Sequence, residues 1–221
     1  MEITAGMVKE LRDRTSVGIL DCKKALRESN GDIDAAVIKL REQGLAAASK
    51  KASRDMNEGR VVVADKDGSA VVFILHCETD FVAKNDEFGA FANQIVDAAL
   101  QNEVTTIEEL KNISLADGQT IAEKITEEIG KIGEKIDLGG FEKVSASYIY
   151  AYNHPGNRLA SMVGLNQDGE HAEDAGKNIA MQVAAMNPVA MDKDSVSQEI
   201  IDRELAVGKE QALNEGKPEN M

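Results

Sequence analysis

The chain has 221 residues, of which 43% are hydrophobic but only 4% aromatic, and it contains no tryptophan, so its core must be mostly aliphatic. The net charge of −14 disfavours nucleic acid or an anionic membrane as the main ligand, because both require a basic protein surface. Residues 1–54 carry 11 Lys and Arg against 8 Asp and Glu, whereas the remainder carries 14 against 31. This asymmetry indicates two modules with different partner surfaces, unless it is a chance excess on solvated faces.

We expect no signal for export or for membrane insertion in this chain. No run of about 18 apolar residues is present, and Met1–Ala5 lacks a basic region followed by an apolar stretch. The two cysteines, Cys22 and Cys77, lie far apart in the sequence and are interpreted as reduced thiols. These features together predict a cytoplasmic protein.

Residues 1–54 are expected to form a three-helix module and a helical connector. Asn30-Gly31 is a turn signal, and Asp32 can cap the third helix. Gly44 suits the left-handed position after that helix, and the Ala- and Lys-rich segment 45–54 then reads as the connector. The apolar positions that mark the three helices are Val8 and Leu11; Ile19, Cys22, Ala25 and Leu26; and Ile33, Ala36, Val37 and Leu40.

The body opens with a predicted β-hairpin, 60–64 and 70–77, around the turn sequence Asp65-Lys66-Asp67-Gly68. Asn85 can cap the next helix, and two capping boxes, Thr106-x-x-Glu109 and Thr120-x-x-Glu123, mark further helix starts. A strand is expected within 135–144, broken by Gly139-Gly140.

A second hairpin is predicted from strands 145–152 and 158–165 around a turn at 153–157, followed by helices at about 172–187 and from Ser195 or Ser197 to Glu215. The first half of the body thus has the order hairpin, helix, helix, strand. The second half has the order hairpin, helix, helix. This order indicates a degenerate internal duplication, although an α+β body can show it by chance. If the duplication is real, the last strand is missing, and the polar end 217–221 suggests a C-terminally shortened form of a longer protein.

The predicted fold class is therefore α+β. The expected segments are a three-helix module with its connector at 1–54, the first half of the core at 55–140, an incomplete second half at 141–192, and the start of a helical hairpin or dimerisation segment at 193–221.

The sequence offers little for catalysis. The densest reactive cluster is His76-Cys77-Glu78-Thr79-Asp80, but neighbours on a strand point to opposite faces, so His76 and Cys77 cannot share a metal or form a nucleophile–base pair without a bulge. Motifs for zinc binding, for phosphate-binding loops and for dinucleotide binding are absent. We therefore predict no catalytic residue, metal or cofactor, and keep an enzyme centred on Cys77 only as a distant alternative.

The stretch Thr79-Asp80-Phe81-Val82-Ala83-Lys84-Asn85 is the unusual feature. It places one aromatic residue among polar residues on a loop between a strand and a helix. Phe81 could fold back under the helix as part of the core. It could instead project as an anchor for a partner's pocket, with Asp80 making a directed polar contact, because protein interfaces combine aromatic anchors with polar rims.

At this stretch the chain resembles the elongation factor Ts family, which acts as the nucleotide exchange factor of the GTPase elongation factor Tu. The resemblance covers essentially the whole chain and is carried by three stretches. They are Val8-Lys9-Glu10-Leu11-Arg12 with Thr15, Gly18 and 21–26; 77–85 with its Thr-Asp-Phe-Val core; and Ala212-Leu213-Asn214-Glu215-Gly216-Lys217-Pro218.

The resemblance implies a ubiquitin-associated-like N-terminal bundle that docks on the nucleotide-binding domain of elongation factor Tu through Arg12, Ile19 and Leu20. It implies that Thr79, Asp80, Phe81 and Val82 form the element that disturbs the magnesium site of the GTPase. His154, in a turn that departs from the shorter family pattern, would press on another part and disturb the phosphate loop. The implied protein exchanges nucleotide on its partner during protein synthesis, binds no nucleotide itself, and has a possible homodimer in its full-length form.

One further interpretation comes from a different class of function. A plain adaptor or chaperone-like module would dock a partner through the bundle without exchanging anything.

Overall fold

The computed structural model describes residues 2–15 and 17–216. These residues form helices and small antiparallel sheets, which confirms the α+β class. The chain divides into two compact units, Met1–Ala184 and Ala185–Met221. The expected polar end at 217–221, with Lys217 and Pro218 of the third resembling stretch, lies outside the described residues. Within the described residues, no helix combines the length and the apolar character needed to cross a bilayer.

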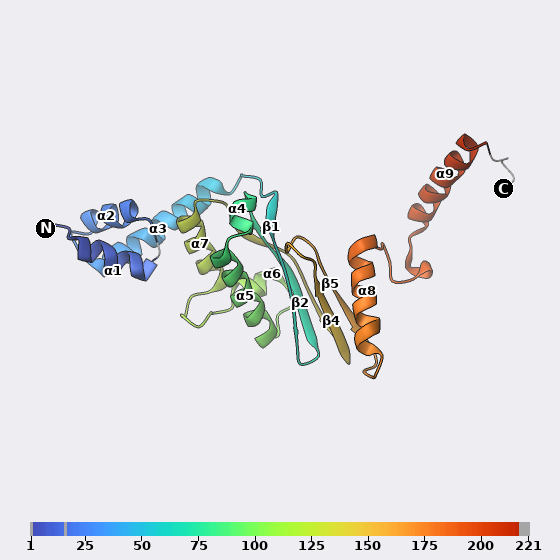
Figure 1. Cartoon of the computed structure of the whole chain (residues 1–221). Helices are drawn as coiled ribbons and strands as arrows, with labels where there is room; N and C mark the ends of the chain where they lie inside the picture. Colours follow the sequence, from blue (N-terminus) through green and yellow to red (C-terminus); the bar gives the residue numbers. More distant parts are fainter. Residues whose placement is uncertain (1, 16, 217–221) are drawn as a thin grey trace. The chain divides into compact units, whose positions relative to one another are not determined.

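The N-terminal helices α1 (Ala5–Thr15), α2 (Ile19–Glu28) and α3 (Ile33–Lys51) form a small bundle (Figure 1). The predicted cap is confirmed, since the side chain of Asp32 accepts a hydrogen bond from the amide of Ala35 at 3.0 Å. The predicted end at Gly44 is wrong, because α3 continues through it to Lys51. The bundle core consists of Leu11, Cys22, Ala25, Leu26, Ala36 and Leu40.

Gly44 instead marks the place where α3 packs against α7 (Ile121–Ile132). A Cβ atom on Gly44 would lie 3.3 Å from the carbonyl oxygen of Thr126, and one on Gly130 would lie 3.3 Å from the Cα atom of Gly44. The close helix contact, and not a helix end, therefore favours a glycine at this position.

The first sheet has the order β1-β2-β3, formed by β1 (Glu58–Lys66), β2 (Ser69–Cys77) and β3 (Asp137–Ser145). The β1–β2 turn uses Asp67 and Gly68 at positive φ, as the turn sequence predicted. The irregularity predicted at Gly139-Gly140 is present as a bulge and not as an interruption of the strand. β3 is continuous, but its register with β2 shifts between the pairs Val72–Glu142 and Ile74–Gly139, and Gly140 has a positive φ.

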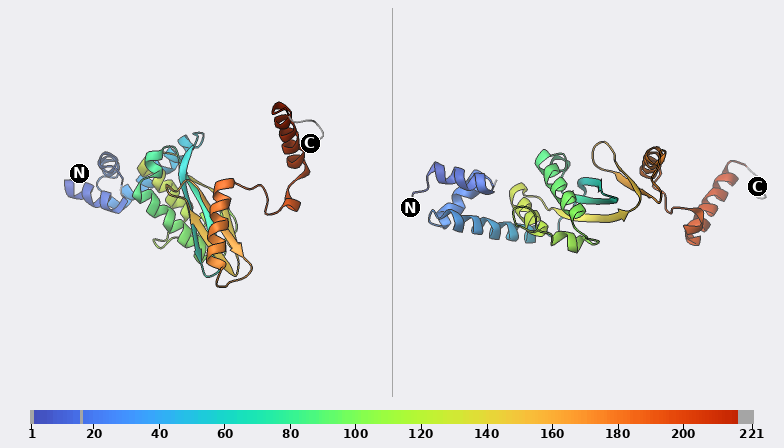
Figure 2. Two further views of the ribbon diagram at one scale, coloured as in Figure 1. Left: turned by 45° about the vertical axis from the view of Figure 1, so that its right-hand side comes forward. Right: turned by 90° about the horizontal axis from the view of Figure 1, so that it is seen from below.

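Alternate residues of β2 point into the main core, where α5 (Asp86–Gln101) packs against the sheet (Figures 1 and 2) and α7 contributes buried side chains. Asn85 caps α5 through its side-chain oxygen, and both predicted capping boxes are present, at α6 (Ile107–Lys111) and α7. The core is mostly aliphatic, with Val71, Phe73, Leu75, Phe88, Phe91, Ile95, Ile121, Ile125 and Ile129 among its buried residues.

The second hairpin, β4 (Tyr148–Asn153) and β5 (Ala160–Leu165), forms a separate two-stranded sheet with α8 (Ala172–Met186) packed on it. A Cβ atom on Gly176 of α8 would lie 2.8 Å from the Cβ atom of Tyr150, and the hydroxyl of Ser161 donates to the carbonyl of Ala180 at 2.7 Å. The return strand begins two residues later than predicted, so Arg158 belongs to the turn. In the second unit, α9 (Gln198–Asn214) follows Ser197 and the short 3₁₀ helix η1 (Lys193–Ser195).

Candidate functional site

The polar stretch after β2 forms a single helical turn, α4 (Asp80–Ala83), that leads directly from the strand. Thr79 occupies the N-cap position in an extended conformation, and its hydroxyl oxygen accepts from the amide of Val82 at 3.5 Å. Val82 and Ala83 pack against the main core. The turn is thereby anchored on its inner side, which leaves its second residue to face outward.

That outward residue is Phe81, whose exposed fraction is 84%. The interpretation of Phe81 as a core residue is therefore wrong, because burial is what defines a core aromatic. Leaving a phenyl ring in water forfeits about 2 kcal/mol of burial free energy, so an isolated, exposed ring on an ordered turn is a feature to be explained.

Asp80 lies beside Phe81 with its side chain 43% exposed. Its carboxylate accepts a hydrogen bond from the ammonium group of Lys84 at 2.7 Å. This bond, the positive charge of Lys84 and the more distant charge of Arg158 lower the pKa of Asp80, so the residue presents a carboxylate near neutral pH.

The turn of the second hairpin lies against the start of β1, close to this element. The amide of Val61 donates to the carbonyl of Asn157 at 2.8 Å, and the guanidinium of Arg158 forms an ion pair with Glu58. His154 is exposed within this turn, and its Nδ1 atom lies 2.8 Å from the hydroxyl of Tyr152. The structure thus brings the His154 turn and the Asp80–Phe81 element, far apart in sequence, to the same end of the first sheet.

The remaining predicted residues belong to the N-terminal bundle. Ile19 and Leu20 form the first turn of α2 and are 54% and 82% exposed, and Arg12 is exposed on α1. Two neighbouring large apolar side chains in water form a small apolar surface that the bundle core does not use.

Two acidic residues that support α4 were not singled out from the sequence as functional. The carboxylate of Glu134 accepts hydrogen bonds from the amides of Glu78 and Thr79, both at 3.0 Å, and from the hydroxyl of Thr79 at 2.6 Å. The carboxylate of Glu78 accepts from the amide of Lys135 at 2.6 Å, which lowers the pKa of Glu78. Contacts between segments more than 50 residues apart leave no local sequence signal, so pattern reasoning could not find them.

His76 and Cys77, neighbours at the end of β2, point to opposite faces of the sheet, as predicted. Cys77 is buried in the main core, and its thiol donates to the carbonyl of Thr79 at 3.2 Å. His76 lies on the opposite face, where its ring packs against Gly139. Burial is the largest cause that raises the pKa of Cys77 to about 11, so the thiol stays protonated near neutral pH. No group of three or more potential metal ligands occurs among the described residues.

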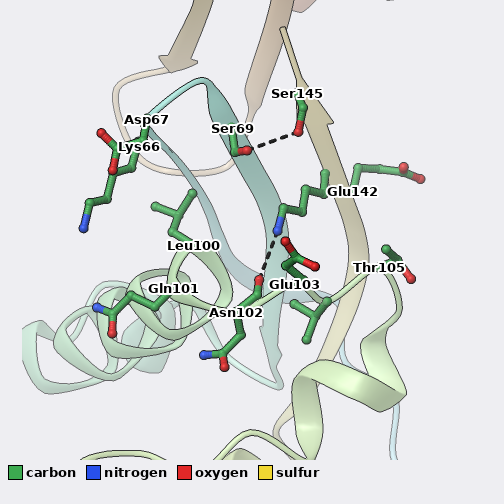
Figure 3. Close-up of a pocket in the computed structure, with 12 residues that line it drawn as sticks. Lys66, Asp67, Ser69, Leu100, Gln101, Asn102, Glu103, Thr105, Glu142 and Ser145 are labelled. Atoms are coloured by element: carbon green, nitrogen blue, oxygen red, sulfur yellow. Dashed lines mark hydrogen bonds between the residues drawn. The ribbon is translucent and has the colours of Figure 1, made fainter.

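The open pocket in Figure 3 lies at the other end of β2, beside the β1–β2 turn. Its walls are held by a hydrogen bond between Ser69 and Ser145 at 3.1 Å and by one from Lys143 to the carbonyl of Asn102 at 3.0 Å. Acidic and basic side chains both line it, and none of the predicted site residues does. The pocket therefore has no clear preference for one charge of ligand.

A family model described as elongation factor TS matches residues 78–221, which include α4 and the second hairpin. The chain is 48% identical to the elongation factor Ts of Amoebophilus asiaticus, 46% to that of Porphyromonas gingivalis and 45% to that of Christiangramia forsetii. Each alignment covers 100% of this chain and 80% of the relative. The chain belongs to the elongation factor Ts family.

Membership of the elongation factor Ts family makes this chain an elongation factor of translation, that is, of protein biosynthesis. The match to elongation factor Ts relatives extends over the bundle as well, since the alignments include the whole chain.

Proposed function

We propose that this chain binds elongation factor Tu and promotes the release of GDP from it, acting as a guanine nucleotide exchange factor with no catalytic site of its own. The observation that carries the proposal is the 84% exposed ring of Phe81 on a turn whose other side is anchored in the core. An aromatic side chain held outward in this way is suited to insertion into a partner.

Exchange requires no covalent chemistry, only a lower barrier to nucleotide release. If the chain binds the nucleotide-free GTPase better than the loaded form, it must weaken nucleotide binding by the same factor. Magnesium requires near-ideal octahedral coordination, so a small displacement of its ligands in the GTPase should cost much binding energy. Phe81 and the carboxylate of Asp80 would produce that displacement.

The other residues have supporting roles in the proposal. Arg12, Ile19 and Leu20 would dock the bundle on the nucleotide-binding domain of the GTPase. Thr79 and Val82 would hold the inserting turn, and His154 would press on a second part of the partner. The proximity of the His154 turn to α4 supports this division, because both elements could reach one partner surface.

We also propose the finer architecture. The bundle would be ubiquitin-associated-like, and the body would be a duplicated hairpin-helix-helix-strand unit without its last strand. The segments 1–54, 55–140, 141–192 and 193–221 would be its domains. The chain would be cytoplasmic. Its partner would be a protein and not a nucleic acid or a membrane, in keeping with the net charge of −14. A homodimer of a longer form is also part of this proposal.

The test is the release of a fluorescent GDP analogue from elongation factor Tu, with and without the chain. We expect strong acceleration by the unmodified chain and little by Phe81→Ala. Leu45→Ala is the matched control, because Leu45 is also a largely exposed apolar residue, 61% exposed on α3, and has no role in the proposal. A stable complex without any acceleration would instead favour the adaptor function.

A further inference from the structure

The loop that carries Phe81 is held by two carboxylates in a reciprocal arrangement. The carboxylate of Glu134, which follows α7, accepts hydrogen bonds from the amides of Glu78 and Thr79. The carboxylate of Glu78 accepts one from the amide of Lys135 at 2.6 Å. Each acidic side chain therefore binds the backbone beside the other. This reciprocal bonding fixes the two segments relative to each other more tightly than a single hydrogen bond would. Neither segment can rotate without breaking hydrogen bonds at both carboxylates.

The third bond to Glu134 determines the direction of the helical turn. The hydroxyl of Thr79 donates its only proton to Glu134 at 2.6 Å, so its lone pairs remain for the amide of Val82. Glu134 thus orients Thr79, the N-cap residue of α4. The N-cap in turn fixes the position of Asp80 and Phe81, the first two residues of the helix.

The supporting segment is itself tied to the end of the bundle. The ammonium group of Lys135 donates to the carbonyls of Ala52 and Arg54 at 2.7 and 2.9 Å. The guanidinium of Arg54 lies 3.2 Å from both carboxylate oxygens of Glu78. These contacts connect the residues after α3, the residues after α7 and the start of α4 in one network.

We propose that Glu134 is a positioning residue for the exchange function, which holds the Thr79–Asp80–Phe81 element in the orientation that enters the partner. The inference rests on the proposed function. It adds that the anchor is preorganised by a carboxylate that does not itself touch the GTPase. Preorganisation matters here because a loop that is already ordered loses less conformational entropy when it binds.

The variants that test this are Glu134→Ala, Glu134→Gln and the double variant Phe81→Ala with Glu134→Ala. A glutamine can keep its oxygen on the two amides and donate its nitrogen to Thr79, so it should restore part of what alanine loses. The matched control is Glu128→Ala, which removes a carboxylate of α7 that is likewise half-buried and pairs with Lys131 at 3.0 Å.

Two measurements are needed. The first is hydrogen exchange at the amides of Glu78 and Thr79, which requires no partner; we expect it to accelerate in Glu134→Ala and not in Glu128→Ala. The second is the dependence of stimulated GDP release on chain concentration. We expect the maximal rate to fall about tenfold in Glu134→Ala, with little change in the half-saturating concentration, because the bundle surface is unaltered.

The double variant separates a positioning role from a general structural one. If Glu134 acts through Phe81, the double variant releases GDP no more slowly than Phe81→Ala alone. A full additional tenfold loss, or a normal rate in Glu134→Ala, would overturn the proposal. Unchanged amide exchange in Glu134→Ala would overturn it as well, whatever the release assay gives. If the unmodified chain does not accelerate release, the exchange function itself fails, and the amide measurement then reports only whether Glu134 orders the loop.

Discussion

The amide of Val61 on β1 donates a hydrogen bond at 2.8 Å to the carbonyl of Asn157, which lies in the turn between β4 and β5. This bond joins the edge of β1 to the turn of the second hairpin. The ion pair between Glu58 and Arg158 forms three residues away on the same edge. The exposed His154 is thereby held near α4, and Arg158 contributes positive charge to the surroundings of Asp80.

Arg158→Ala should lower stimulated GDP release while leaving the free energy of unfolding within about 1 kcal/mol of the unmodified chain. The stability effect is small because the Arg158 side chain is 63% exposed and solvent screens its ion pair. The loss of activity is expected because the turn loses an ion pair that holds it against β1. Denaturant unfolding and the GDP-release assay measure the two quantities. Arg158→Lys, which keeps the charge, serves as the control, and unimpaired release by Arg158→Ala would contradict a positioning role for this turn.

Phe81→Ala should abolish most of the stimulated release without destabilising the fold. A side chain that is 84% exposed loses little packing when truncated, so the free energy of unfolding should change by less than about 0.5 kcal/mol. Phe73→Ala is the contrasting variant, because Phe73 is fully buried in the main core and its truncation should cost about 3–5 kcal/mol. Comparable destabilisation by both variants would show that Phe81 packs inward in solution.

The local signals of the sequence predicted local structure well. Asp32, Asn85, Thr106 and Thr120 all cap the helices they were expected to cap, because a cap is a hydrogen bond between residues two or three positions apart. The exposure of Phe81 could be posed only as two alternatives, since the sequence does not show which side of a turn faces the core.

The errors arose where distant segments meet. A glycine near a helix end and a glycine at a helix contact look the same in a sequence, so Gly44 was assigned to the wrong role. The support of α4 by Glu134 was also out of reach, because the two elements are separated by more than 50 residues. The candidate site was therefore predicted as a set of residues, while the contacts that hold it required the structure.

Gly44→Leu should destabilise the first compact unit by about 1–3 kcal/mol, because its Cβ atom would already lie 3.3 Å from the backbone oxygen of Thr126. Gly6→Leu is the matched control in a helix of the same bundle. A Cβ atom there meets only the hydroxyl of Thr4, at 3.8 Å, so this variant should not lose stability. Denaturant unfolding of both variants gives the comparison. Equal stability of the two would show that α3 and α7 do not pack as closely in solution.

The thiol of Cys77 should react far more slowly with an alkylating reagent in the folded protein than in urea. Burial, followed by the charges of Glu134 and Glu58, raises its pKa from 9.0 to about 11, so at pH 8 only about one thiol in a thousand is ionised. Peptide mapping after a short exposure to the reagent at pH 8 separates Cys77 from Cys22, and rapid labelling of folded Cys77 would contradict its burial.

The same pKa difference predicts how stability depends on pH. Between pH 9 and 11 the unfolded chain has released the Cys77 proton while the folded chain still binds it. The unfolded state therefore binds fewer protons, and the contribution of Cys77 to stability falls as the pH rises through this window. Cys77→Ala removes this contribution, so its free energy of unfolding should decline less between pH 9 and 11 than that of the unmodified chain. Parallel declines in the two proteins would mean that the thiol titrates alike in both states, and that the core around Cys77 opens to solvent at high pH.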